Sequence, residues 1–330
     1  MMRLPRFSYR RPQTAAEAVA ILAASGPDAL VVAGGTDVYP NMKQRLLRPK
    51  VVVALRGIPG LGQIEYDDRQ GLRLGSMVTL REIAEHQDVR RLYPALASAA
   101  ESVSTPQLRT MGTIGGNVCL DTRCNYYNQD LDWREALGFC LKSGGDICRV
   151  ARSSPTCRAI NCSDTAPVLQ AFGASIVVTG PHGERRVRLE DFYVDDGIQR
   201  WNKAADEIVT GIAVPPPAPG TRSVYLKLRS RSSVDFPLLG VALVAELDGR
   251  GVCRGAKMVL GAVAPRPLEI TALAEALVGS RLDKAAIERA ARAVFLAGKP
   301  LDNTIATISY RKRMLAVYAR RAIAQIAAAA

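Results

Sequence analysis

Cysteine is the residue type whose spacing first suggests chemistry in this chain of 330 residues. Six of its seven cysteines fall within residues 119–162, namely Cys119, Cys124, Cys140, Cys148, Cys157 and Cys162, and only Cys253 lies elsewhere. Because thiolates are soft ligands, such crowding indicates a zinc site or an iron–sulfur cluster rather than a set of small buried apolar side chains. The C-x-x-C pair usual in structural zinc sites is missing, and wide, irregular spacing suits a cluster whose ligands bind separate corners. The spacing alone leaves both metals open.

Two glycine-rich turns form a second chemical feature, Val32-Ala-Gly-Gly-Thr-Asp-Val38 and Gly112-Thr-Ile-Gly-Gly-Asn117. Glycine allows the backbone to approach a ligand closely, and successive N–H groups can form an anion-binding nest. The Thr36 hydroxyl adds a donor, and Asp37 can accept from a ribose. Neither turn matches the dinucleotide or P-loop pattern, so each alone is equally an ordinary tight turn. Two such turns in one chain favour a diphosphate ligand.

Three regions are expected to position these residues. Residues 1–55 contain a helix that opens at a capping box, Thr14 to Glu17, and two short apolar strands at 30–33 and 51–55. Residues 56–220 contain strands at 72–76, 175–179 and 207–214, and helices beginning at the capping box Thr79 to Glu82 and spanning 92–103. Residues 112–117 are expected to be a loop, the cysteine-rich stretch 118–161 shows little periodicity, and the proline-rich stretch 215–220 is expected to be a linker.

The third region, residues 221–330, places strands before helices. Strands are expected at 224–228, 241–247 and 257–263, and helices at 268–278, 284–296 and 309–328. This order predicts an α+β domain.

Composition excludes several classes of function. The net charge of +13 comes from scattered Lys and Arg without a base-stacking pattern, so a solvated basic surface, or one that meets an acidic electron-donor protein, is favoured over nucleic-acid binding. The only two histidines, His86 and His182, lie far apart, which excludes a histidine-rich metal site. No apolar run is long enough to span a membrane, and the basic N-terminus lacks the apolar segment of a secretory signal. A cytoplasmic location is therefore expected, where disulfides are rare.

The two glycine turns are similar to the signature of the flavin subunits and domains of the xanthine dehydrogenase and carbon monoxide dehydrogenase family. The resemblance continues in order through Ser163–Gly173 and Lys227–Asp235, and through the strand that follows at 237–242, so it covers nearly the whole chain. It implies an α+β fold with a two-part FAD-binding domain of the PCMH (vanillyl-alcohol-oxidase-like) type. A C-terminal α+β domain of the carbon monoxide dehydrogenase flavoprotein type, with an antiparallel sheet and helices, would follow.

The same resemblance implies one non-covalent FAD whose diphosphate is clamped by the two turns. It places the cofactor-binding residues at Val32, Ala33, Gly34, Gly35, Thr36, Asp37, Val38, Thr110, Gly112, Thr113, Gly115, Gly116, Asn117, Asp164, Lys227 and Asp235. It further implies a molybdopterin-binding large subunit and a small subunit with two [2Fe–2S] clusters, assembled as a dimer of heterotrimers. No residue of this chain is then expected to be catalytic toward the substrate.

One departure from the family pattern carries the cysteines. Roughly forty residues separate Asn117 from Asp164, where most members have only a few. Such an insertion resembles that of 4-hydroxybenzoyl-CoA reductase, whose flavin subunit carries an additional [4Fe–4S] cluster. The match covers 116–124, 127–129, Trp133, 138–142 and 145–148. By that match the ligands are Cys124, Cys140, Cys148 and Cys157. Position alone leaves open whether Cys162 replaces Cys157.

The resulting expectation is an electron-transfer subunit of a molybdenum-dependent aromatic-CoA reductase, fed by a ferredoxin-like donor. One alternative is the flavin subunit of a xanthine, aldehyde or N-heterocycle hydroxylase that passes electrons outwards to a ferredoxin-like acceptor. Another is a non-redox protein stabilised by zinc. A self-sufficient flavin oxidase is disfavoured because no substrate acid–base residue is evident.

Overall fold

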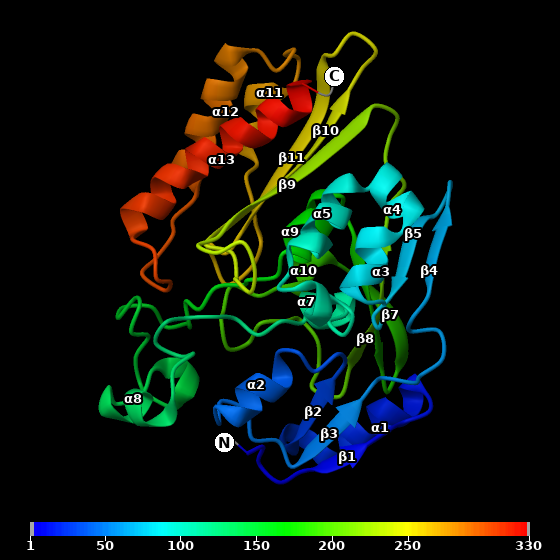
Figure 1. Ribbon diagram of the computed structural model, residues 1–330, viewed down its shortest axis with the longest axis vertical. Helices are drawn as coiled ribbons and strands as arrows, with labels where there is room; N and C mark the ends of the chain where they lie inside the picture. The colour runs from blue at the N-terminus through cyan, green and yellow to red at the C-terminus, as the bar shows by residue number, and fades with distance from the viewer. Residues whose placement is uncertain (1–2, 329–330) are drawn as a thin grey trace.

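Three β-sheets follow one another along the long axis of the molecule in the computed structural model, which describes residues 3–328 (Figure 1). The first sheet is parallel, with strand order β1-β3-β2, and contains β1 (Ser8–Arg10), β2 (Ala29–Val32) and β3 (Val51–Ala54). With it lie α1 (Ala15–Ser25), η1 (Gly26–Asp28) and α2 (Val38–Lys43). The Thr14 hydroxyl accepts from the Glu17 N–H at the start of α1, which confirms the predicted helix start.

The second sheet is antiparallel, with order β4-β5-β8-β6-β7. Its strands are β4 (Ile64–Asp67), β5 (Gly71–Gly75), β6 (Ser175–Gly180), β7 (Gly183–Arg188) and β8 (Ile208–Val214). The helices of this region are α3 (Leu80–Glu85), α4 (Gln87–Leu92), α5 (Pro94–Ser102), α6 (Pro106–Arg109), α7 (Ile114–Val118), α9 (Thr165–Ala171) and α10 (Leu189–Phe192). The predicted strands at 72–76, 175–179 and 207–214 and the capping box at Thr79 are confirmed.

Two predictions for this region are wrong in detail. The helix expected over 92–103 is divided at Tyr93, because α4 ends at Leu92 and Pro94, which cannot donate a backbone N–H, starts α5. The second glycine turn is not entirely a loop, since α7 begins at Ile114. The Thr113 hydroxyl caps α7 by accepting from the Gly116 N–H, and this local bond outweighs the low helix propensity of the glycines.

The cysteine-rich insertion projects from the middle region as a separate lobe (Figure 1). Its regular elements are α8 (Leu131–Ala136) and η2 (Leu141–Ser143). Backbone hydrogen bonds in both directions between Arg123 and Ile160 close its base. Asn303 fastens the lobe to the C-terminal region, because its carbonyl accepts from the Asn125 N–H and its side-chain amide donates to the Arg158 carbonyl at 2.9 Å. The buried guanidinium of Arg311 in turn donates to the Asn303 side chain at 3.0 Å.

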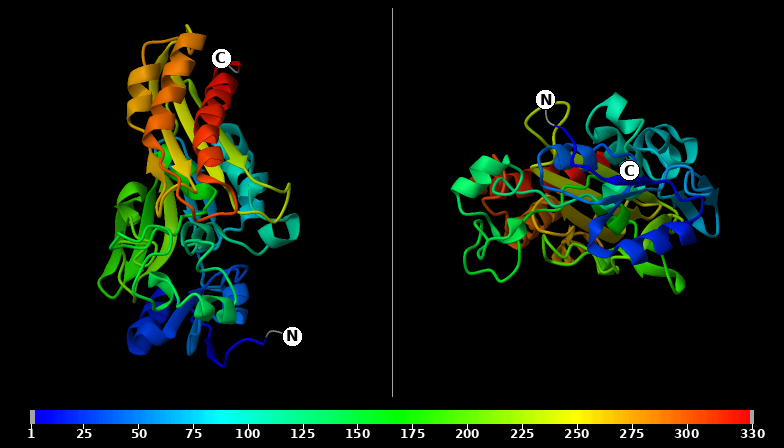
Figure 2. Two further views of the ribbon diagram at one scale, coloured as in Figure 1. Left: turned by 90° about the vertical axis from the view of Figure 1, so that its left-hand side faces the viewer. Right: turned by 90° about the horizontal axis from the view of Figure 1, so that it is seen from below.

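The third sheet is antiparallel, with order β12-β11-β10-β9, and contains β9 (Thr221–Leu228), β10 (Leu239–Leu247), β11 (Cys253–Gly261) and β12 (Leu268–Glu269). One face is covered by α11 (Ala272–Leu277), α12 (Lys284–Ala297) and α13 (Ile308–Ala328), as Figure 2 shows from the side. Its other face packs on α5 and α9, so Tyr225, Ala242 and Val259 belong to the core of the middle region.

The α+β character of the C-terminal region is confirmed, and one of its helices is corrected. Residues 268–278 are not a single helix, because Leu268 and Glu269 pair with the edge of β11 as β12 before α11 begins. The helices predicted at 284–296 and 309–328 are confirmed. Within residues 3–328, no helix is long and apolar enough to cross a membrane.

Candidate functional site

The two glycine turns, more than seventy residues apart in sequence, lie against each other. A Cβ atom built on Gly34 would overlap the carbonyl oxygen of Met111, and one built on Gly112 would lie 3.5 Å from the Thr36 hydroxyl oxygen. A Cβ on Gly116 would lie 3.9 Å from the Cβ of Ala33. The structure therefore brings the predicted residues of the first turn, 32–38, together with those of the second, and glycine at position 34 allows that approach.

Among the described residues, the first turn has a run of free backbone donors, whereas most donors of the second turn bind acceptors within the protein. Within residues 3–328, the N–H groups of residues 34–37 donate to no protein acceptor, and Gly35 has a φ of +73°. In the second turn, the N–H groups of Gly115 and Gly116 donate to the Ser76 carbonyl and the Thr113 hydroxyl. Free N–H groups on a turn with a left-handed glycine fit a nest that binds a phosphate group. The donor set of the first turn thus fits the diphosphate of a dinucleotide.

Asp37 connects the first turn to the insertion. One of its carboxylate oxygens accepts from the guanidinium of Arg123, and the other accepts from the Asn41 amide at 3.0 Å. Burial raises the pKa of Asp37, although the positive charge of Arg123 opposes that shift. The Arg123 guanidinium also lies 4.1 Å from the centre of the Phe236 ring in the β9–β10 loop. Arg123 lies in the matched segment 116–124 but was not among the predicted residues, since the sequence does not show its partner Asp37.

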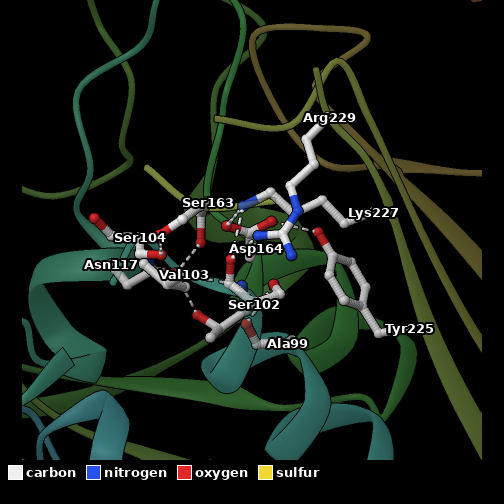
Figure 3. A network of polar contacts seen from close by, with 12 residues as sticks. Ala99, Ser102, Val103, Ser104, Asn117, Ser163, Asp164, Tyr225, Lys227 and Arg229 are labelled. Atoms are coloured by element: carbon white, nitrogen blue, oxygen red, sulfur yellow. Dashed lines mark hydrogen bonds and ion pairs between the residues drawn. The ribbon is translucent and has the colours of Figure 1, made fainter. Parts of the chain in front are cut away.

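Asp164 and Lys227, both predicted to bind the cofactor, form a buried ion pair of 2.8 Å (Figure 3). The second oxygen of Asp164 accepts from the Tyr225 hydroxyl at 2.6 Å, and the Lys227 ammonium also donates to the Ser102 carbonyl. Burial raises the pKa of Asp164, and Lys227 opposes the shift. The polar atoms of this pair are therefore directed to protein partners, and their contact with a cofactor stays a prediction.

The ion pair lies next to the end of the second turn. The Asn117 side-chain oxygen accepts from the hydroxyls of Ser163 and Thr165, each at 2.7 Å, on either side of Asp164 (Figure 3). These bonds fix Asn117 against the start of α9. The Asp235 carboxylate binds Arg231 at 2.7 Å, and within residues 3–328 it makes no hydrogen bond or ion pair to another predicted residue.

Loss of one partner of the buried pair is expected to destabilise the chain strongly. Lys227→Met leaves the Asp164 carboxylate buried without its counter-charge, which typically costs about 3–5 kcal/mol. The free energy of unfolding, measured by denaturant titration, gives the value. The double variant with Asp164→Asn is the control, because it removes both charges and should recover part of the loss. Equal stability of Lys227→Met and the wild type would contradict the assigned role.

Four of the cysteines converge on one small cavity inside the insertion. Its lining includes Cys124, Cys140, Cys148 and Cys157, which we call the cysteine quartet, together with Tyr126, Tyr127, Lys142 and Arg149. All four side chains are buried and none is in a disulfide. The structure thus brings together the four ligands that the family resemblance proposed.

The remaining cysteines lie in other parts of the molecule. Cys119 borders the core of the middle region, Cys162 packs with Leu120, Ile160 and Ala262, and Cys253 lies in the core of the C-terminal region. Burial raises the pKa of the Cys162 thiol to about 12 and that of Cys119 to about 11. The alternative that Cys162 replaces Cys157 gains no support from this placement.

Backbone N–H groups are aimed at two sulfurs of the quartet, that of Tyr126 at Cys124 and that of Ala159 at Cys157. Burial nevertheless raises the pKa of Cys124 to about 12 and that of Cys157 to about 11, so the free thiols are neutral near pH 7. No group of three or more His, Cys, Asp or Glu side chains among residues 3–328 is arranged to hold one metal ion.

Both parts of the chain match known protein families. Residues 5–217 match the family model described as the FAD binding domain in molybdopterin dehydrogenase, and residues 224–326 match that of the CO dehydrogenase flavoprotein C-terminal domain. The chain belongs to the FAD-binding medium subunits of the molybdenum hydroxylase family. This FAD-binding subunit is thus a component of an oxidoreductase, and the expected two-domain fold is confirmed.

Individual relatives agree with that assignment. The FAD-binding subunit is 34% identical to the aldehyde oxidoreductase FAD-binding subunit PaoB of Escherichia coli, over 81% of this chain and 84% of the relative. It is 30% identical to the carbon monoxide dehydrogenase medium chain of Afipia carboxidovorans, over 96% and 95% of the two chains. A crystal structure of Cu,Mo-CO dehydrogenase in a cyanide-inactivated form superposes with a TM-score of 0.82 at 29% identity, with full coverage of both chains.

Proposed function

We propose that this chain is the FAD- and [4Fe–4S]-carrying electron-transfer subunit of a molybdenum-dependent aromatic-CoA reductase similar to 4-hydroxybenzoyl-CoA reductase. The observation that carries the proposal is the cysteine quartet, gathered on one cavity beside the first glycine turn. Four thiolates suit an iron–sulfur core, in which each cysteine binds a different iron and the sulfurs need not meet at one atom.

FAD is proposed to lie against the two glycine turns. The N–H groups of Gly35 and Thr36 would bind the diphosphate, and Asp37, held by Arg123, would accept from the ribose. Asn117, fixed by Ser163 and Thr165, would keep the second turn in place. Bound FAD supplies a carrier that exchanges one or two electrons, which lets two-electron and one-electron partners communicate.

The proposed partners follow from the family and its members' names. A molybdopterin-binding large subunit and a small subunit with [2Fe–2S] clusters would complete the enzyme, and a ferredoxin-like protein would exchange electrons with the insertion. Relatives named medium chain or FAD-binding subunit support such an assembly. Because no residue of this chain is proposed to act on the substrate, the substrate reaction would take place on the large subunit.

The alternative is a flavin subunit of an aldehyde, xanthine or N-heterocycle hydroxylase that passes electrons outwards. Names of relatives favour it, since they include an aldehyde oxidoreductase and a nicotinate dehydrogenase. The purified complex decides between the two. Given reduced ferredoxin and 4-hydroxybenzoyl-CoA, it should release benzoyl-CoA, whereas oxidation of aldehydes or N-heterocycles without any dehydroxylation would contradict the reductase proposal.

Assembly provides a separate test. An affinity-tagged chain, isolated without oxygen from cells that express its own operon, is expected to co-purify with two unlike subunits in equal amounts. The physical reason is that the described residues offer a proposed flavin site and the cysteine quartet but no site for the molybdenum cofactor. Mass spectrometry of the eluate gives the composition. A stable monomer that turns over substrate without partners would contradict the proposal.

A further inference from the structure

The cavity of the cysteine quartet has a buried cation in its wall. The Lys142 side chain is 6% exposed and lines the cavity, and its ammonium lies 4.5 Å from the centre of the Tyr127 ring. The ammonium donates to the Asp121 carboxylate at 2.6 Å and to the Thr122 hydroxyl at 2.6 Å. A third donation, to the Thr122 carbonyl at 3.1 Å, completes its hydrogen bonding. Lys142 is therefore fixed in place and is not a mobile surface side chain.

The charges around Lys142 do not cancel. Asp121 accepts from Arg200 as well as from Lys142, so a single carboxylate faces two cations. The Arg200 guanidinium stacks over Trp201 at 4.1 Å, and its buried Nε has no hydrogen-bond partner in the described chain. The Cys157 thiol of the quartet lines the same cavity as Lys142. One of the two positive charges is therefore not neutralised by Asp121. A buried charge of this kind is stabilised by an anion beside it.

We propose that Lys142 is the counter-charge of the metal–thiolate centre held by the cysteine quartet and that it sets the reduction potential of that centre. The inference rests on the proposed function, since it requires an iron–sulfur cluster in the cavity. Four thiolates make the cluster anionic, and reduction adds one more negative charge. A fixed ammonium nearby stabilises the reduced form more than the oxidised form, so it raises the potential. Asp121 positions the ammonium and offsets part of its charge.

Three variants separate charge from packing. Lys142→Met keeps the length of the side chain without its charge, and the cluster should become at least tenfold harder to reduce, a shift of about −59 mV for one electron. Lys142→Arg keeps the charge and should change the potential much less. Asp121→Asn removes the opposing charge and should shift the potential upwards. If Lys142 acted through packing alone, Lys142→Met and Asp121→Asn would not shift the reduction potential in opposite directions.

The experiment is a reductive titration of the whole complex, followed by electron paramagnetic resonance, on samples whose iron and sulfide contents equal those of the wild type. The flavin potential in the same samples is the internal reference and should stay constant. An unaltered cluster potential in Lys142→Met, or shifts of the same sign in Lys142→Met and Asp121→Asn, would overturn the inference. If Lys142→Met does not retain iron, Asp121→Asn decides: a raised potential supports the inference, and an unchanged or lowered one refutes it.

Failure of the proposed function would look different. A wild-type complex that contains no iron and no acid-labile sulfide contradicts the cluster itself, before any variant is compared. A loaded wild-type cluster whose potential ignores Lys142 contradicts only the role assigned to that residue.

Discussion

Serine in place of any one member of the cysteine quartet is expected to strip the chain of iron and acid-labile sulfide while FAD stays bound. The serine hydroxyl is a harder and weaker ligand for iron than a thiolate. Because the cavity is buried, no ligand from the solvent can replace the lost thiolate. Iron should fall from about four atoms per chain to fewer than about one, as expected for loss of a [4Fe–4S] cluster. Colorimetric iron and sulfide analysis, with the flavin absorbance of the same sample, measures both quantities.

Matched controls come from the same chain. Cys162 and Cys253 are as buried as the quartet, yet they pack elsewhere, so Cys162→Ser and Cys253→Ser should leave the iron content unchanged. The choice between Cys157 and Cys162 is decided by the same measurement. Loss of iron in Cys162→Ser but not in Cys157→Ser would reassign the fourth ligand. About one zinc and no sulfide in the wild type would contradict the cluster and favour a structural metal.

A side chain at Gly35 is the change with the second largest expected effect. Gly35 has a φ of +73°, and a Cβ there would overlap the ring of Tyr39. Gly35→Val is therefore expected to displace the turn whose free N–H groups are proposed to face the diphosphate. FAD should bind at least roughly 100-fold more weakly, equivalent to about 3 kcal/mol. Acid extraction of FAD from the purified complex, followed by fluorescence titration of the stripped protein, gives the affinity.

Gly173 provides a control of equal backbone strain. It has the same φ of +73°, but nothing lies within 4 Å of a Cβ built there. Gly173→Val should lower stability by a similar strain energy and leave FAD affinity unchanged. Equal loss of FAD in both variants would mean that strain, not the position of the first turn, causes the effect.

Local patterns in the sequence were enough to predict most elements of this fold. Capping residues fix where helices begin, so the start of α3 at Thr79 could be read directly. Long-range pairing could not be read in this way. The two residues of β12 are a strand only because β11 leaves an edge open, and α7 forms in a glycine-rich segment because of its cap and its contacts with Ser76 and Val78.

The candidate site, like the fold, was only partly predictable from the sequence. The sequence shows how many cysteines crowd together, but only the chain's path shows that Cys162 points away from the cavity that the quartet lines. Lys142 and Arg123 lie in segments that match the reductase insertion, but only the structure shows that their partners are Asp121 and Asp37. Conversely, Asp164 and Lys227 stand within a recognisable motif, yet the partners of their polar atoms are in the protein itself.

The contacts of Asn303 with the insertion bear on the order of events during synthesis. The carbonyl of Arg158 and the N–H of Asn125, which directly follow Cys157 and Cys124, both bind Asn303, a residue made 145 positions after Arg158. A nascent chain that has emerged only through Cys157, the last member of the quartet, therefore lacks these bonds to Asn303. We expect metal centre assembly to be post-translational and to require a nearly complete polypeptide.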